Sequence, residues 1–191
     1  MKIISGNFRG TRITAPKGLR LRPTANLVRE AVFNVAGPFV ESGLILDLFA
    51  GSGAFGFEGL SRDASEVVFV DVSRTACSHL KRVGEQLGVQ KRMAILNMNA
   101  MKAVKMLATR EKKFSLVFLD PPYYSNDIDQ IFGMKEFAQL LSDNGLVVCE
   151  TSSRSKIEVL PPDMHDFFSR KYGETMVNMF RVHPGLIEET V

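Results

Sequence analysis

The sequence predicts an α/β fold built on a mostly parallel sheet, and three observations support this prediction. Short apolar runs alternate with amphipathic stretches of helical length from residue 44 onward, as in chains built from β-α-β units. A glycine-rich turn links the first of these runs to the first amphipathic stretch. Near the C-terminus, two apolar runs flank Gly173-Glu174, which predicts an antiparallel hairpin that closes the sheet. The 191 residues fit one domain with a small appendage.

The first 23 residues predict that appendage, a small β-hairpin extension ahead of a main domain that spans residues 24–191. Apolar and basic residues alternate along Lys2–Ser5 and Thr11–Ala15, as expected for two short paired strands. Prolines and a glycine then mark a loop. Thr24 fits the N-cap of a helix that continues to about Ala36, where Gly37-Pro38 ends it.

The main domain contains five apolar runs before its final hairpin. These runs are Leu44–Phe49, Glu66–Val70, Met93–Leu96, Phe114–Leu119 and Leu146–Cys149. The helical stretches between them lie at about 54–61, 74–87, 100–109 and 127–142. The final hairpin consists of Asp166–Tyr172 and Met176–Val182. Strands that alternate with helices of this length imply a parallel sheet covered on both faces.

Composition excludes several classes of protein. No apolar run approaches the roughly 20 residues needed to span a bilayer, and the N-terminus lacks the pattern of a signal peptide. Cys77 and Cys149 provide neither a disulfide framework nor the spacing of a metal site, and the three histidines are scattered. We therefore expect a cytoplasmic protein that binds no membrane and no metal, and we expect it to be a monomer.

Basic residues are concentrated at the N-terminus. The first 30 residues carry seven basic side chains and one acidic side chain, whereas the other 161 carry 17 basic and 20 acidic ones. A folded basic surface beside a neutral-to-acidic domain indicates a polyanionic partner, and we predict a nucleic acid. The residues that we expect to contact it are Arg9, Arg12, Arg20, Arg22 and Arg29. The alternative is that these charges are only a solvated tail.

The glycine-rich turn follows the first strand and opens a helix, and it reads G-x-G-x-x-G at Gly51, Gly53 and Gly56. Glycine permits a tight turn and lets a ligand approach the backbone closely. The spacing alone is a weak signal, because a turn without a ligand has the same requirement. The neighbouring residues Phe49, Ala50 and Ser52 belong to the same predicted binding loop.

Asp47 favours a cationic cofactor over a dinucleotide, whereas Asp71 suits either one. Asp47 lies four residues before Gly51, at the end of the first strand, where its charge would attract an ammonium or sulfonium group and repel a pyrophosphate. Asp71 ends the second strand, and a carboxylate there can accept hydrogen bonds from both hydroxyls of a ribose. Asn99 follows the third strand, where it fits either an adenine contact or the N-cap of the next helix. Together these residues predict S-adenosylmethionine as the cofactor.

The fourth strand runs directly into Asp120-Pro121-Pro122-Tyr123. Two prolines make the turn stiff and leave its carbonyls free as acceptors. Asp120 and a proline carbonyl can therefore accept both N–H bonds of an exocyclic amine, while Tyr123 offers a face on which a base can stack. Such bonds localise the amine lone pair on nitrogen, ready to attack a methyl group. These four residues are the predicted catalytic segment, although a rigid surface turn has a similar composition.

The chain resembles the bacterial RsmD-type family, which methylates guanine N2 in 16S ribosomal RNA. The resemblance covers nearly the full length. It rests on the segments Ile3-Ile4-Ser5-Gly6, Arg9-Gly10, Leu21-Arg22-Pro23-Thr24 and Val28-Arg29-Glu30-Ala31-Val32-Phe33-Asn34, followed by the glycine-rich and Asp-Pro-Pro-Tyr segments described above. It implies a Rossmann-like class I S-adenosylmethionine-dependent methyltransferase fold of seven strands, with an N-terminal hairpin that grips the RNA.

The resemblance also implies an activity, a substrate and site residues. The activity is of the guanine(966)-N(2) type, on a small ribosomal subunit that is partly assembled. Asp47, Gly51 and Gly53 would line the methionine part of the cofactor, Asp71 would hold its ribose, and Asn99 its adenine. The Asp-Pro-Pro-Tyr segment would hold the target guanine.

Three other functions remain to be weighed. An adenine-N6 methyltransferase acting on DNA or RNA would use the same Asp-Pro-Pro-Tyr geometry, so only the N-terminal resemblance favours guanine. An NAD-dependent oxidoreductase is disfavoured by Asp47. A catalytically idle RNA-binding module is disfavoured by the intact segment that begins at Asp120.

Overall fold

The computed structural model describes residues 1–14, 25–122 and 125–183. Its α-helices are α1 (Ala25–Ala36), α2 (Ala54–Ser61), α3 (Arg74–Leu87), α4 (Ala100–Ala108), α5 (Asp127–Phe132) and α6 (Lys135–Gln139). Two short 3-10 helices are η1 (Gly37–Phe39) and η2 (Gln90–Arg92). The strands are β1 (Leu44–Asp47), β2 (Glu66–Asp71), β3 (Met93–Asn97), β4 (Phe114–Leu119), β5 (Leu141–Ser152), β6 (Met164–Tyr172) and β7 (Thr175–Val182).

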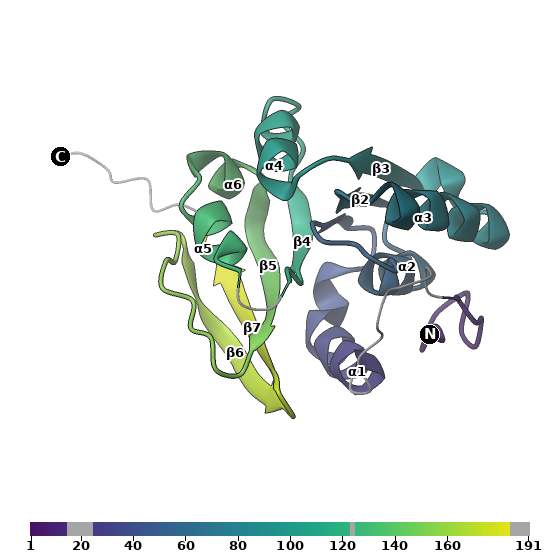
Figure 1. Ribbon diagram of the computed structural model, residues 1–191, viewed down its shortest axis with the longest axis horizontal. Helices are drawn as coiled ribbons and strands as arrows, with labels where there is room; N and C mark the ends of the chain where they lie inside the picture. Colours follow the sequence, from purple (N-terminus) through teal and green to yellow (C-terminus); the bar gives the residue numbers. More distant parts are fainter. Residues whose placement is uncertain (15–24, 123–124, 184–191) are drawn as a thin grey trace.

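The strands form one sheet in the order β3-β2-β1-β4-β5-β7-β6 (Figure 1). The first five strands are parallel, and β7 pairs antiparallel with both β5 and β6. The chain order reverses at β1, which lies between β2 and β4, so the carboxyl ends of these strands open at the switch point where α/β sheets bind ligands. This architecture confirms the predicted mostly parallel sheet with a C-terminal hairpin.

Helices cover both faces of the sheet and enclose two hydrophobic cores. The first core lies between the sheet and α1, α2 and α3, and Phe33, Phe57 and Leu80 are among its buried members. The second lies under α4, α5 and α6, and it includes Leu107 and Phe132. Because successive side chains of a strand point to opposite faces, each central strand contributes to both cores. This explains why the strands appear in the sequence as continuous apolar runs.

The N-terminal hairpin is packed into the first of these cores. An antiparallel bridge joins Lys2 and Arg12, the Ile3 N–H donates to the Thr11 carbonyl at 3.0 Å, and Ile3 and Ile13 are both buried in the first core. The predicted strand pair is therefore present as a short bridge. Its tip is held on α2, since the Phe8 N–H donates to the Ser61 hydroxyl at 2.9 Å. Among the described residues, no helix is long and apolar enough to cross a membrane.

The prediction of a single helix over residues 127–142 is wrong. Two short helices occupy part of this range, and the chain turns between them at Gly133, a residue that weakens helices. The strand predicted at 146–149 is much longer, because β5 already begins at Leu141. Its first part was hidden by Asp143, Asn144 and Gly145, where the pairing with β4 shifts register and Asn144 has a φ of 60°.

Candidate functional site

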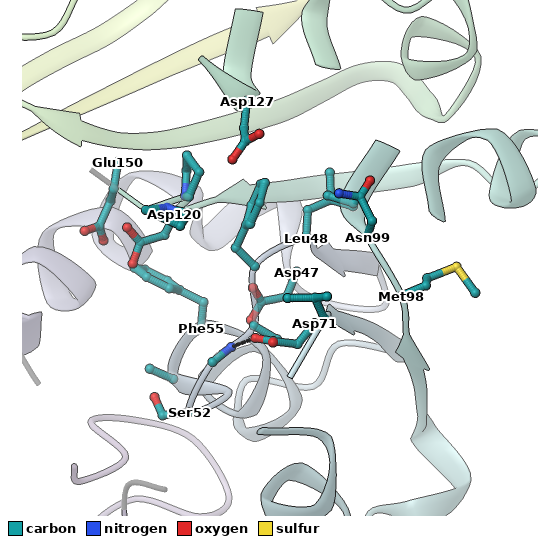
Figure 2. Close-up of a pocket in the computed structure, with 18 of the residues that line it drawn as sticks. Asp47, Leu48, Ser52, Phe55, Asp71, Met98, Asn99, Asp120, Asp127 and Glu150 are labelled. Atoms are coloured by element: carbon teal, nitrogen blue, oxygen red, sulfur yellow. Dashed lines mark hydrogen bonds between the residues drawn. The ribbon is translucent and has the colours of Figure 1, made fainter. Parts of the chain in front are cut away.

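A cavity of about 450 Å³ opens at the carboxyl ends of β1, β2, β4 and β5 (Figure 2). It brings together most of the predicted cofactor and catalytic residues. Those that line it are Asp47, Phe49, Ala50, Gly51, Ser52, Asp71, Asn99, Asp120, Pro121 and Pro122. Gly53 lies just behind this wall, and Tyr123 is outside the described residues.

The glycine-rich loop between β1 and α2 forms one wall of the cavity. Gly53 has a φ of +76°, and a Cβ there would lie 2.5 Å from the side chains of Leu80 and Phe57. A Cβ on Gly56 would lie 2.1 Å from the ring of Phe69, so only glycine lets α2 pack this closely on β2. The second and third glycines of the motif are therefore required by the fold, and they fix the path of the loop beside the cavity.

Asp71 ties this loop to the end of β2. Its Oδ2 accepts the Gly51 N–H at 2.8 Å, and its Oδ1 accepts the Ser73 N–H at 2.7 Å. Each carboxylate oxygen can accept a further hydrogen bond, so Asp71 can hold the loop and still accept bonds from a diol. Val72, which is 74% exposed, and Met98 add apolar surface on the same side of the cavity. Sequence reasoning missed both residues, although each immediately follows a strand end.

Asp47 is the most deeply buried acid of the cavity, with 4% of its surface exposed. Its Oδ2 accepts the Gly56 N–H at 3.3 Å. The pKa of Asp47 is raised to about 7, chiefly by burial; the Gly56 hydrogen bond opposes this rise, and the nearby charges of Asp120 and Asp71 add to it. A cationic ligand would oppose this shift, because a nearby positive charge favours the ionised carboxylate.

Asn99 has the capping role that the sequence left open. Its Oδ1 accepts the Met101 N–H at 3.0 Å and the Lys102 N–H at 3.4 Å, so it caps the N-terminus of α4. The same side chain lines the cavity. The contact with an adenine ring therefore stays a prediction, compatible with the cap because the amide nitrogen is a separate donor.

Strand alternation brings four acidic side chains to one face of the sheet. Each lies two residues after a strand residue that is buried in the first core, and side chains two residues apart share a face. The pairs are Ile45 and Asp47, Phe69 and Asp71, Phe118 and Asp120, and Val148 and Glu150. Glu150, which the sequence did not distinguish from a surface group, is only 7% exposed and lines the cavity. The sequence offered one signal, since Glu150 directly follows the apolar run Leu146–Cys149.

Phe55 and Asp127 also line the cavity and were missed by sequence reasoning. Phe55, in the first turn of α2, stacks on Phe118 with 4.6 Å between ring centroids and presents an apolar wall beside Asp120 (Figure 2). Asp127 projects toward the cavity from the start of α5 (Figure 2). The cavity thus combines acidic groups at the sheet edge with an aromatic wall, which suits a planar ligand beside a cationic one.

Arg29 lines the cavity but is bound mostly within the protein, so its predicted contact with RNA stays a prediction. Arg29 is 1% exposed and donates to the Lys2 carbonyl at 2.5 Å and to the Asn26 side chain at 3.2 Å. Its Nε also lies 3.6 Å from the buried Glu58 carboxylate. The pKa of Arg29 is lowered, chiefly by burial, and the negative charge of Glu58 partly offsets this lowering. The guanidinium therefore holds the hairpin, α1 and α2 together.

The other predicted RNA contacts divide into two groups. Arg9 and Arg12 are exposed on the hairpin. Arg20 and Arg22 lie outside the described residues. Contact with RNA stays a prediction for these four arginines.

The comparisons with known proteins agree with this geometry. The family described as "Conserved hypothetical protein 95" matches residues 1–181. The chain is 34% identical over 152 residues to Ribosomal RNA small subunit methyltransferase D of Haemophilus influenzae, covering 79% of this chain and 78% of the relative. The solved structure of the Escherichia coli protein yhhF is 27% identical with a TM-score of 0.81, covering 97% of this chain and 99% of that one.

The fold alone is also shared with a more distant structure. An RNA methyltransferase from Salinibacter ruber, solved in complex with S-adenosyl-L-homocysteine, is 12% identical with a TM-score of 0.65, covering 90% of this chain and 98% of that one. The predicted Rossmann-like class I methyltransferase fold is confirmed.

Proposed function

We infer that this chain, which belongs to the family of ribosomal RNA small subunit methyltransferase D, is an enzyme that uses S-adenosylmethionine to methylate ribosomal RNA. We further propose that it modifies the exocyclic N2 amine of a guanine in 16S ribosomal RNA of the small subunit. The observation that carries the proposal is the cavity, which joins the glycine-rich loop and Asp47 to Asp120-Pro121-Pro122 at one sheet edge.

The residues of the cavity fit S-adenosylmethionine. When bound, this cofactor supplies a methyl group made electrophilic by a positively charged sulfonium. Asp47 is buried beside Asp71 and Asp120, and burial chiefly raises its pKa, so a cationic group of the cofactor would favour its ionised form. Asp71 keeps acceptor capacity for ribose hydroxyls while it holds the loop. Val72 and Asn99 flank the place expected for the adenine ring.

Asp120 and Pro121 supply the groups that orient the amine. The Pro122 carbonyl accepts the Ser125 N–H at 3.2 Å, so we assign the Pro121 carbonyl, beside the Asp120 carboxylate, to the amine hydrogens. Accepting both N–H bonds localises the lone pair on the amine nitrogen and aims it at the methyl donor. The Asp120 carboxylate then stabilises the positive charge that develops on nitrogen, or takes its proton. The base must leave its stack to enter such a cavity.

The N-terminal hairpin supports binding of a large RNA. Its exposed Lys2 and Arg9 line a second cavity of about 610 Å³, together with Asn26 and the 58% exposed Leu27 of α1. Cations beside an apolar side chain suit a nucleotide, whose phosphate and base need different partners. We therefore assign residues 1–23 to RNA binding and residues 24–191 to methyl transfer, in a protein that acts as a monomer in the cytoplasm.

Incubation with methyl-labelled S-adenosylmethionine and small ribosomal subunits, followed by digestion to nucleosides, tests the proposal. N2-methylguanosine in 16S RNA is the expected product. N6-methyladenosine would instead establish the alternative, an adenine-N6 methyltransferase. Absence of label from free RNA, partly assembled subunits and mature subunits alike would overturn the proposed RNA substrate.

A further inference from the structure

The cavity at the sheet edge is acidic on almost every side. Five acidic side chains line it, and Arg29 is the single basic side chain among the described lining residues. S-adenosylmethionine carries a carboxylate as well as its ammonium and sulfonium groups. In such surroundings a further carboxylate is repelled unless a positive charge lies close to it. Among the described residues of the cavity wall, Arg29 is therefore the side chain that can supply this charge.

Arg29 keeps a surplus of positive charge although it is paired. Its Nε lies 3.6 Å from the Glu58 carboxylate, and the Arg62 Nε lies 3.0 Å from the same carboxylate. Two guanidinium groups thus share one negative charge, so the cluster stays positive as a whole. Arg29 is the member that lines the cavity. Because it is only 1% exposed, its charge is little screened by water and acts strongly on an anion in the cavity.

The guanidinium lies next to the glycine-rich loop. Its Nη1 lies 3.4 Å from the Met1 Sδ, and the Ser52 hydroxyl lies 4.0 Å from the same sulfur. Arg29 and Ser52 therefore occupy one part of the cavity wall, with Met1 behind them. Sulfur is a weak acceptor, so a carboxylate oxygen would be a stronger partner for both groups.

The order of the predicted contacts along the cavity brings the cofactor carboxylate to this part of the wall. Ser52 and Asn99 lie on opposite sides of the cavity, and Asp71 lies between them (Figure 2). S-adenosylmethionine has the adenine at one end, the ribose in the middle and the amino-acid group at the other end. With the adenine beside Asn99 and the ribose at Asp71, the amino-acid group reaches Ser52 and Arg29.

We propose that the Arg29 guanidinium binds the carboxylate of S-adenosylmethionine, with the Ser52 hydroxyl as a second donor. Asp47 then faces the cationic groups, so the charged residues of the cavity match both signs of charge on the cofactor. Arg29 is thereby a cofactor-binding residue as well as part of the junction between the hairpin and α2. This inference rests on the proposed function for its cofactor, and it is independent of which base is methylated.

Decarboxylated S-adenosylmethionine isolates this contact. It keeps the adenosine, the sulfonium and the terminal amine, and it lacks only the carboxylate. Calorimetric titration of the full chain gives a Kd for each compound, and the measured quantity is the Kd of the decarboxylated compound divided by that of S-adenosylmethionine. The wild-type ratio should be roughly 10 to 100, the effect of losing a hydrogen bond between charged groups. If the wild-type chain binds neither compound, the proposed function has failed, and the role of Arg29 fails with it. Binding of both compounds with a ratio near one overturns the role of Arg29 alone.

Arg29→Gln should lower this ratio by roughly tenfold, because the amide brings no positive charge to the carboxylate. The affinity for the decarboxylated compound should change little. Arg62→Gln is the matched control, since it removes the same charge from the same cluster but not from the cavity wall. Its ratio should stay at the wild-type value.

An unchanged ratio in Arg29→Gln overturns the proposal, and so does an equal fall in Arg62→Gln, which would indicate a general effect of charge at the junction. Weaker binding of ribosomal RNA to Arg29→Gln with an unchanged ratio would assign the guanidinium to the RNA instead. Arg29→Met replaces Arg29→Gln if the amide variant does not fold, because its apolar chain fills part of the same space while Glu58 keeps Arg62. The same fall in the ratio is expected. If neither variant folds, the wild-type ratio decides: a value above roughly tenfold supports the contact, and a smaller one overturns it.

Discussion

The junction between the hairpin and α2 and the cavity at the sheet edge both bury carboxylates, but they surround them differently. At the junction, the buried Glu58 accepts the N–H groups of Ile4 and Ser5 at 2.8 and 3.0 Å, and the guanidinium groups of Arg29 and Arg62 lie 3.6 and 3.0 Å away. In the cavity, four acidic side chains lie on one face of four neighbouring strands.

This difference separates Glu58, whose charge serves the fold, from Asp47, whose charge suits a cationic ligand. Glu58 is neutralised within the protein, so its removal should cost stability. Burial and acidic neighbours raise the pKa of Asp47, so a cationic ligand is expected to favour its ionised form. The comparison predicts that variants of the two regions fail in different assays.

The largest expected effect belongs to Asp120. Asp120→Asn should lower the rate of methyl transfer by about 10²- to 10⁴-fold. The neutral amide can neither offset the positive charge that develops on the amine nitrogen nor take its proton. Its unfolding free energy should change by less than about 1.5 kcal/mol, and cofactor affinity should persist. Label transfer, urea unfolding and calorimetric titration measure the three quantities. A variant that loses stability instead of activity would erase the distinction between the regions.

Glu58→Gln should show the opposite pattern. Both carboxylate oxygens accept hydrogen bonds: one from Ser5 and Arg62, the other from Ile4, with the Arg29 guanidinium 3.6 Å from this second oxygen. An amide can accept on only one side, so we expect a loss of about 3–5 kcal/mol in unfolding free energy.

Glu66→Gln is the matched control for this variant. Glu66 pairs with Lys112 at 2.7 Å, but both side chains are about one third exposed, so the loss should stay below about 1 kcal/mol. Urea unfolding of both variants checks the contrast, and equal losses would contradict it.

The third prediction concerns pH and Asp47. A folded-state pKa of about 7, above the ordinary value of 3.8, means that the ligand-free folded protein holds a proton which the unfolded chain has released. The contribution of Asp47 to stability is therefore present at low pH and is lost as pH rises from about 4 through about 7. Ligand-free Asp47→Asn should lack this loss, so it should gain stability relative to wild type between about pH 5 and pH 8.

The same carboxyl should make cofactor binding depend on pH. A cationic ligand favours the ionised form of Asp47, so binding below about pH 7 should release a proton. The affinity should therefore fall by up to about tenfold for each unit by which the pH is lowered below 7. Calorimetric titrations in buffers of different ionisation enthalpy measure the number of protons released on binding. Asp47→Asn serves as the control with no such dependence, and a wild-type profile equally flat would contradict a protonated Asp47.

The smallest effect is expected on the outer surface of the hairpin. Arg9→Ala and Arg12→Ala should each reduce the slope of log affinity for RNA against log salt by about 0.7–0.9, because each removes one phosphate contact. Cofactor affinity should not change. Replacement of the exposed Lys171 of β6 by alanine is the control. Salt slopes that stay at the wild-type value in both arginine variants would contradict RNA binding by the hairpin.

The sequence was sufficient for features that depend on local spacing. Asp47, Asp71 and Asp120 each end an apolar run, and parallel strands bring such ends to one edge, so their meeting could be predicted without coordinates. The limits of α2 and α3 followed from the glycine turn before one helix and the residues that flank the other. The same holds for the final hairpin, where Gly173-Glu174 leaves room only for a tight turn.

Features that depend on distant partners could not be predicted. Arg29 looked like one more cation of a basic segment, because its ion-pair partner Glu58 lies on a different helix, 29 residues later in the chain. Glu150 acquires significance only once the register places it beside Asp120. The start of β5 was missed because Asn144 and Gly145 resemble a loop, although the strand continues through them.

The arrangement of the four acids by strand alternation also limits which changes in length the enzyme can survive. Inserting or deleting a single residue within the inner part of β4 or β5 would turn Asp120 or Glu150 toward the α4–α6 side, even if every strand hydrogen bond reformed. A change of two residues would restore the face but displace the carboxyl along the strand by about 6.6 Å, too far to meet the same amine. Among relatives that keep this chemistry, differences in length should therefore fall at the opposite ends of these strands, where the chain enters the sheet.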